Sequence, residues 1–153
     1  MLNQDPGLLA AAVLRAPFLD PLTSMLDQSL PLTTEEVEEW GDPTTCEATR
    51  RAMAAYSPYA GLRRQRYPAM LLVAAEHDVR VPFTQALRYV ACVRHCTVAP
   101  EGDVDHGDPP PPQLLHLRES GGHLDEGGRF RRLELSSMEA VFLMHAVGAT
   151  CTV

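Results

Sequence analysis

Continuous apolar runs and helically spaced apolar positions alternate along the chain. The clearest run is Ala69–Ala75, which stops abruptly at Glu76, His77 and Asp78. A short run that is apolar at every position is typical of a strand buried on both faces of a parallel sheet. A second run begins at Leu8 and reaches Ala16-Pro17, where the residue before proline is restricted to extended or turn conformations. We expect a strand here as well, although the alanine-rich sequence leaves a helix open as the alternative.

Helical spacing appears in three places. After Pro82, one apolar face is formed by Phe83, Ala86, Leu87, Val90 and Val93. A last helix is marked by Phe130, Leu133, Met138, Val141 and Phe142. An earlier helix is indicated between residues 33 and 41, where Thr33 and Glu36 have the spacing of a capping box. Gly41 and Pro43 end that helix.

The remaining segments complete an alternating order of strands and helices. The sequence "QLLHLRESGGH", residues 113–123, predicts a short third strand that ends in a glycine turn. Residues 56–68 and 99–112 are rich in proline and glycine and read as loops, and residues 148–153 read as a tail. The order strand, helix, strand, helix, strand, helix predicts an α/β protein with a mostly parallel sheet and flanking helices. A sheet of three strands is small for this class, so we expect the C-terminal part of a larger fold.

Composition excludes several classes of function. The chain has 153 residues, enough for one domain, and 45% of them are hydrophobic. Its net charge of -7 argues against nucleic acid as a partner, because nucleic acid requires a basic face. No apolar run approaches the roughly 20 residues that span a bilayer. The first residues, "MLNQDPGLL", lack the features of a signal peptide, which favours a cytoplasmic protein.

Cysteines and histidines give no pattern of metal ligands. The four cysteines, Cys46, Cys92, Cys96 and Cys151, are scattered, and we expect reduced thiols. Cys92 and Cys96 flank His95 but lack a second ligand pair at short spacing. The other histidines outside the glycine turn share no spacing and are treated as structural or solvated. We therefore expect neither a metal nor a cofactor.

Two residues with catalytic chemistry follow the last two predicted strands. Asp78 and His123 stand where parallel strands deliver their carboxyl ends, which is where open α/β sheets bind ligands. An aspartate and a histidine in this order form two members of a Ser…Asp…His relay. Simpler roles are open, since Asp78 can cap the helix that follows and Arg80 can form a surface ion pair. No serine of this chain lies in a Gly-x-Ser-x-Gly motif.

Several motifs extend this pattern to a known family. They are "LPLTTEEVEEWG" at 30–41, "YSPY" at 56–59, "HDVRVP" at 77–82 and "GGH" at 121–123. Over residues 2–146 the chain resembles the C-terminal end of the prolyl oligopeptidase family. The resemblance implies an α/β-hydrolase fold and a serine peptidase that acts on short peptides, or on esters or thioesters in one branch. By motif match, Asp78 is the expected triad aspartate, His123 the triad histidine, and Arg80 a residue that binds the substrate main chain.

The resemblance also implies what these residues lack. We expect residues 1–147 to be a partial α/β-hydrolase domain, with the nucleophile elbow lying before residue 1. The chain by itself is then expected to be inactive, and to be unstable, oligomeric or prone to aggregation, because strands that cover its apolar faces are missing. The alternative is a non-catalytic short form that acts as a binding or regulatory module, through the acidic segments 33–40 and 101–112.

Overall fold

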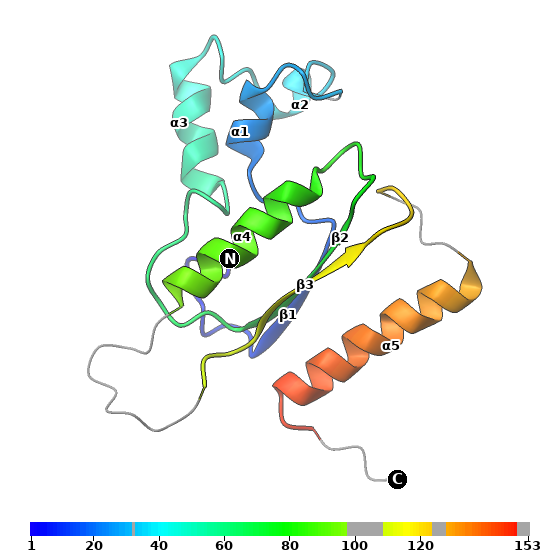
Figure 1. Cartoon of the computed structure of the whole chain (residues 1–153). Helices are drawn as coiled ribbons and strands as arrows, with labels where there is room; N and C mark the ends of the chain where they lie inside the picture. Colours follow the sequence, from blue (N-terminus) through cyan, green and yellow to red (C-terminus); the bar gives the residue numbers. More distant parts are fainter. Residues whose placement is uncertain (32, 98–108, 124–127, 150–153) are drawn as a thin grey trace.

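A three-stranded parallel sheet organises the molecule (Figure 1). The computed structural model describes residues 1–31, 33–97, 109–123 and 128–149. The strands lie in the order β1-β2-β3, and they are Ala11–Arg15, Ala69–Ala75 and Gln113–Arg118. The helices are α1 (Pro21–Leu26), α2 (Val37–Trp40), α3 (Glu47–Tyr56), α4 (Phe83–Cys96) and α5 (Arg129–Ala146). The predicted α/β class and the parallel sheet with flanking helices are confirmed.

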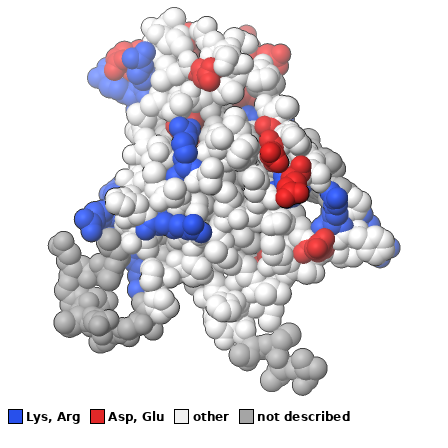
Figure 2. Space-filling model, in the orientation of Figure 1, with Lys and Arg blue, Asp and Glu red and all other residues white. Residues whose placement is uncertain are grey.

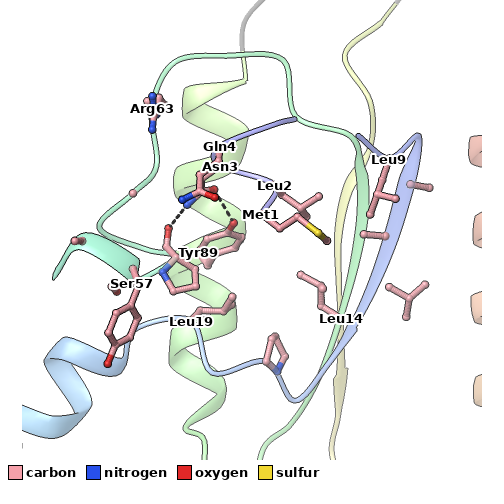
Figure 3. A pocket seen from close by; sticks show the side chains of 18 of the residues that line it. Met1, Leu2, Asn3, Gln4, Leu9, Leu14, Leu19, Ser57, Arg63 and Tyr89 are labelled. Atoms are coloured by element: carbon pink, nitrogen blue, oxygen red, sulfur yellow. Dashed lines mark hydrogen bonds between the residues drawn. The ribbon is translucent and has the colours of Figure 1, made fainter. Parts of the chain in front are cut away.

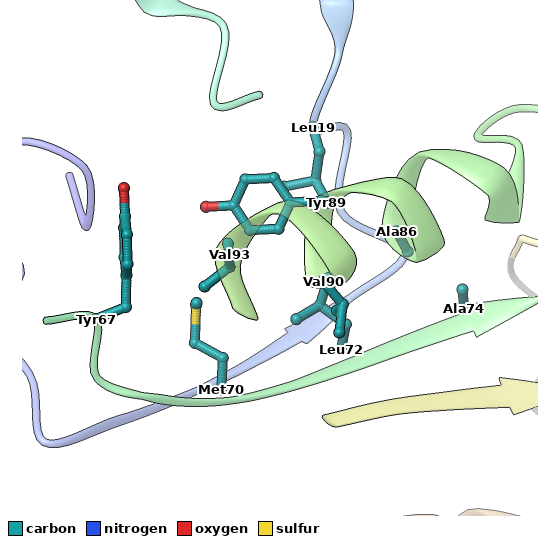
Figure 4. Close-up of a cluster of buried hydrophobic side chains, with 9 residues drawn as sticks. All are labelled: Leu19, Tyr67, Met70, Leu72, Ala74, Ala86, Tyr89, Val90 and Val93. Atoms are coloured by element: carbon teal, nitrogen blue, oxygen red, sulfur yellow. The ribbon is translucent and has the colours of Figure 1, made fainter. Parts of the chain in front are cut away.

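The central strand β2 is buried on both faces along its whole length. Its side chains alternate, so that Met70, Leu72 and Ala74 face α4 whereas Ala69, Leu71 and Val73 face α5. Figure 4 shows the first set lying beneath Ala86, Val90 and Val93 of α4. Burial on both sides is the physical reason that this segment is continuously apolar instead of alternating.

Helix α4 confirms the predicted amphipathic segment, with one correction. Ala86, Tyr89, Val90 and Val93 are buried in the core, whereas Leu87 is 51% exposed. A helical turn takes 3.6 residues, so positions 86, 89, 90 and 93 share one face and position 87 lies beside it. The prediction was therefore wrong for Leu87, and it missed Tyr89 because tyrosine is not a purely apolar residue.

Strand β1 confirms the strand prediction for the alanine-rich run, but it is shorter and less buried than expected. Residues 11–14 are only half-buried, because β1 has one partner strand among the described residues and forms an edge of the sheet. The strand ends at Arg15, and the next residue, Ala16, has a φ of 40° in the left-handed region and precedes a proline. The Ala16 N–H still donates to the Val73 carbonyl at 2.8 Å, so the chain turns away immediately after the sheet.

The connection between β1 and β2 differs most from the prediction. The described residues of this connection form three helices instead of one, and these lie together beyond the carboxyl end of β1 (Figure 1). Helix α1 begins after Asp20, whose Oδ1 accepts the Thr23 N–H at 3.3 Å. Helix α3 was missed because its sequence is polar overall, and Met53 is its one buried residue.

The predicted capping box is wrong. Helix α2 begins at Val37 and, within the described residues, no side chain caps its N-terminus. Thr33 is too far from this start to cap it, and its hydroxyl instead donates to the Ser24 carbonyl at 2.9 Å. Trp40 packs edge-to-face on Phe18 with 5.4 Å between ring centroids, so the two rings join α2 to the segment that follows β1.

Two buried polar side chains, Gln85 and Glu139, join segments that lie far apart in the sequence. Gln85 of α4 accepts the N–H groups of Leu19 and Asp20 through Oε1, at 3.3 and 3.1 Å. Its Nε2 donates to Ser24 Oγ at 2.6 Å, so α4 holds the entry into α1. On the other face, Arg15 donates to both carboxylate oxygens of the buried Glu139 and thereby ties β1 to α5.

Helix α5 extends beyond the predicted span of 130–142, and its packed face agrees with the prediction at Met138 and Phe142 only. Its packing residues are Leu135, Met138, Phe142 and Ala146. Phe130, Leu133 and Val141, which were expected to mark the packed face, are exposed. No helix or strand occurs in residues 57–68, as predicted. Most of the predicted acidic loop at 99–112 and of the tail at 148–153 lies outside the described residues.

Tyr89 makes the core less stable at alkaline pH. Its burial, together with the neighbouring Tyr67, raises the pKa of Tyr89 to about 12. An unfolded tyrosine has a pKa of about 10, so the neutral phenol stabilises the fold below about pH 10. We expect about 2 to 3 kcal/mol of the free energy of unfolding to be lost as the pH rises from about 10 to about 12. Urea unfolding across this range measures the loss.

The matched variant is Tyr89→Phe, which keeps the ring and removes the ionisable group. All 13 cationic side chains of the chain are arginines, so no lysine titrates in the same range. Tyr89→Phe should retain stability that the wild type loses above about pH 10. Equal losses in both proteins would contradict a buried, titrating Tyr89.

Candidate active site

Asp78 follows the end of β2 and is buried by its own turn. The side chain is 1% exposed, and the Asp78 N–H donates to the Ala75 carbonyl at 3.2 Å. Its Oδ1 accepts the backbone N–H groups of Arg80 and Val81, each at 2.9 Å. Aspartate favours turns of this kind because its short carboxylate reaches the backbone two or three residues on. The Asp78 side chain therefore shapes the turn after β2 and also occupies the predicted site position.

His123 lies against the other oxygen of that carboxylate. Its Nδ1 is 2.8 Å from Asp78 Oδ2, and the imidazole is 24% exposed. The two residues meet because β2 and β3 are parallel neighbours, with Ala75 paired to Arg118. A proton on Nδ1 satisfies the carboxylate and leaves Nε2 with a lone pair. The arrangement can hold an imidazole in one tautomer and accept a proton at Nε2.

The glycine turn before His123 has a conformational requirement at one of its two glycines. Gly121 has a φ of 90°, a region that residues with a side chain rarely adopt. Gly122 is not constrained by space, since an added Cβ would meet the His77 carbonyl oxygen at an ordinary 3.7 Å. The turn thus needs Gly121 for its backbone path, and Gly122 adds flexibility directly before the histidine.

Arg80, in the same loop, reaches Glu36, which directly precedes α2. Its Nη2 lies 3.7 Å from Glu36 Oε1, and the Arg80 side chain is 50% exposed. The ion pair that was considered at the sequence level is therefore present, while half of the guanidinium side chain faces solvent. Glu36 was interpreted as part of a helix cap and was missed as a neighbour of the site. No local pattern marks it, because the contact is between residues far apart in the sequence.

The described residues hold no cluster of three or more side chains suited to a metal ion. Cys92 lies 3.4 Å from the Tyr59 hydroxyl, a contact that raises the pKa of Tyr59.

None of the described helices is long and apolar enough to cross a bilayer. Charged side chains are scattered over the face shown in Figure 2, without a continuous basic patch.

A separate cavity of about 720 Å³ lies beside β1 (Figure 3), and none of the three predicted site residues lines it. Its lining is mainly apolar and includes Leu2, Leu9, Leu14 and Leu19. At one side, Asn3 Nδ2 donates to the Pro58 carbonyl at 2.7 Å, and the Tyr89 hydroxyl donates to Asn3 Oδ1 at 3.5 Å. The side chains of Asn3 and Tyr89 are thus engaged with each other, and the paired Asp78 and His123 remain the stronger candidate for chemistry.

Comparison with known proteins shows which family the sequence matches. The sequence pattern of the prolyl oligopeptidase family matches residues 1–149. The chain is 40% identical over 130 residues to a prolyl endopeptidase-like protein of Gallus gallus, a match covering 80% of this chain and 17% of that protein. It is 31% identical over 146 residues to Protease 2 of Moraxella lacunata, covering 95% of this chain and 20% of that protein.

A solved structure shows the same fold. Oligopeptidase B from Leishmania major superimposes with a TM-score of 0.85 at 29% sequence identity, over 99% of this chain and 20% of that one. The prolyl endopeptidase-like protein of Homo sapiens matches 81% of this chain at 36% identity, again over 17% of its own length. The chain therefore spans about a fifth or less of the length of the proteins that it resembles.

The buried carboxylate of Asp78 should contribute measurably to stability. Asp78→Ala leaves the N–H groups of Arg80 and Val81 without their acceptor and removes the partner of His123. We expect the free energy of unfolding to fall by about 1 to 3 kcal/mol, because partly buried donors lose their hydrogen bonds. Urea denaturation monitored by circular dichroism measures the difference.

Asp27→Ala is the matched control. Asp27 also accepts a backbone N–H two residues on, from Ser29 at 3.0 Å, but it is exposed. Water replaces that bond, so the control should lose much less stability than Asp78→Ala. Equal losses would show that burial of the Asp78 carboxylate is not what matters.

Proposed function

The chain belongs to the prolyl oligopeptidase family, and from this we propose that it supplies the acid–base part of a serine hydrolase active site. Asp78 and His123 are the relay residues behind a serine nucleophile. The observation that carries the proposal is the 2.8 Å contact between Asp78 Oδ2 and His123 Nδ1, which leaves Nε2 available for proton transfer.

In the proposed reaction, His123 Nε2 takes the proton of the serine hydroxyl as that oxygen attacks the substrate carbonyl. The same nitrogen then donates the proton to the leaving group. The Asp78 carboxylate holds the tautomer with a protonated Nδ1 and stabilises the imidazolium that forms. The N–H groups of Arg80 and Val81 keep Oδ1 in place, so that Oδ2 stays directed at the ring.

The nucleophile is proposed to come from polypeptide outside these residues. The chain has no Gly-x-Ser-x-Gly motif, and it spans 17–20% of the length of the relatives described above. Residues 1–147 are then a partial hydrolase domain, with 148–153 as a tail. An isolated chain of this kind has the base and its orienting carboxylate but nothing for the base to activate.

The proposed substrates are short peptides, or small esters or thioesters. A peptide substrate is supported by the names of relatives such as Protease 2 and the Dipeptidyl aminopeptidase BI of Pseudoxanthomonas mexicana. Arg80 is proposed to bind the substrate main chain, because its guanidinium is half exposed beside Asp78 and carries five donors for carbonyl groups.

The first test is the intact mass and N-terminal sequence of the endogenous protein, isolated with an antibody against α5. A species heavier than 16.8 kDa that contains Gly-x-Ser-x-Gly and reacts with a fluorophosphonate probe supports the proposal. A species of 16.8 kDa without reactivity would instead favour a non-catalytic binding module.

Substitutions in the longer polypeptide test the two relay residues. We expect Asp78→Asn to lower kcat on the order of 10⁴-fold, because the wrong tautomer is favoured. His123→Ala should lower kcat on the order of 10⁶-fold, because the general base is lost. His145→Ala is the control, since His145 is exposed in the last turn of α5. Normal turnover of a peptide ester by the Asp78 and His123 variants would overturn the assignment.

Arg80 should act on binding more than on chemistry. Arg80→Ala is expected to raise KM about tenfold for a peptide substrate while changing kcat less, as for a contact made equally in the ground and transition states. Arg51→Ala is the matched control, because Arg51 is a more exposed arginine that contacts Glu47 at 3.8 Å. An unchanged KM in Arg80→Ala would leave Arg80 with only its ion pair to Glu36.

A further inference from the structure

Within the described part of the chain, side chains and not backbone hydrogen bonds hold the turn that carries His123. The last backbone bond of this part of the sheet runs from the Glu76 N–H to the Arg118 carbonyl at 2.9 Å. Among the described residues, no backbone–backbone hydrogen bond then involves residues 119–123. Gly121 and Gly122 add conformational freedom directly before the histidine. The position of the imidazole therefore depends on the few side-chain contacts that reach this turn.

Arg118 contacts the residue that directly precedes His123. It is the last residue of β3, and its backbone is fixed by pairing with Ala75 at the end of β2. Its Nη2 donates to the carbonyl of Gly122, the residue before His123, at 3.1 Å. The guanidinium thus joins the rigid end of the strand to the peptide unit that leads into the histidine.

We propose that Arg118 is a positioning residue that holds His123 against Asp78 through the Gly122 carbonyl. A charged donor forms a stronger bond to a carbonyl than a neutral one, and the planar guanidinium fixes direction as well as distance. The consequence for catalysis rests on the proposed function, whereas the consequence for the geometry of His123 does not.

A second arginine reaches the same turn from the opposite side. Arg131, in the first turn of α5, donates through Nη1 to Ser120 Oγ. Both members of this contact are exposed, and Ser120 is further along the chain from His123 than Gly122. The bond from Arg118 is partly buried and acts on the backbone itself, so Arg118 is the residue that sets the position of the ring.

The tautomer of His123 is the direct readout. A neutral histidine in water prefers its proton on Nε2, whereas a ring held against the Asp78 carboxylate keeps its proton on Nδ1. Two-bond ¹H–¹⁵N spectra of the histidine-labelled 153-residue chain, recorded at about pH 9 where an ordinary imidazole is neutral, distinguish the two forms. Asp78→Ala identifies the His123 signal by abolishing its Nδ1–H form.

We expect Arg118→Met, which retains the apolar part of the side chain, to remove the Nδ1–H preference of His123. Arg118→Lys should restore part of it, because an ammonium can donate to the Gly122 carbonyl. The matched control is Arg94→Met. Arg94 donates to the Gln113 carbonyl at 2.8 Å, so this variant removes the same kind of bond from the opposite end of β3. The Nδ1–H form should persist in Arg94→Met.

Urea unfolding of both arginine variants separates positioning from general loss of structure. A tautomer that changes in Arg118→Met but not in an equally stable Arg94→Met supports the proposal. An unchanged tautomer in a folded Arg118→Met overturns it, as does the same change in both variants. Should Arg118→Met fail to fold, Arg118→Lys provides the test, and a fully wild-type signal together with wild-type turnover of the longer polypeptide would overturn the proposal.

Kinetics of the longer polypeptide keep this proposal distinct from the proposed function. There, Arg118→Met should lower kcat about 10- to 100-fold with little change in KM, as expected when a catalytic group is misplaced without loss of substrate contacts. A change of tautomer without any Asp78-dependent hydrolysis would reject the hydrolase function and leave the positioning role standing. Hydrolysis that depends on Asp78 but not on Arg118 would reject the positioning role alone.

Discussion

The carboxylate of Asp78 divides its two oxygens between the chain that follows β2 and the ring of His123. Oδ1 accepts the backbone N–H groups of Arg80 and Val81, and Oδ2 lies 2.8 Å from Nδ1. Because the side chain is 1% exposed, little water competes for these bonds, and their geometry is more sharply defined than that of a surface carboxylate. The loop after β2, the turn after β3 and the orientation of the imidazole all depend on this one group.

The rest of the fold places that carboxylate. Strand β2 is buried on both faces, so its end is one of the more rigid points of the molecule. Helix α4 then returns the chain to the start of β3, beside β2, which brings the two carboxyl ends to one edge of the sheet. A site built on strand ends gains precision from the sheet and adaptability from the loops. The adaptable component here is the glycine turn before His123, and Arg118 restrains it.

The same edge gathers charged groups from distant parts of the sequence. Glu36 precedes α2 and reaches Arg80, which follows β2. The segment between β1 and β2 therefore contributes to the surroundings of the site as well as covering the end of the sheet. On the other side of the sheet, the Arg15–Glu139 ion pair connects β1 with α5. Phe130, Leu133 and Val141 of α5 are exposed and residues 11–14 of β1 are only half-buried, and the expected low stability of the chain by itself stays a prediction.

The sequence by itself determined the elements whose burial leaves a periodic trace. Residues 69–75 are apolar throughout because two layers cover them, and α4 repeats with the helical period because one layer covers it. Asp78 and His123 were also identified as candidates, since each follows a strand and each matches a family motif.

Only the tertiary structure decided the features that rest on contacts across the chain. Helix α1 has only six residues and α3 buries only Met53, so neither has a long apolar face, and Glu36 and Arg118 have roles that depend on a partner's position. The spacing of apolar residues indicates which positions are buried. The contact of a side chain with an atom far away in the sequence is decided only when the strands pair.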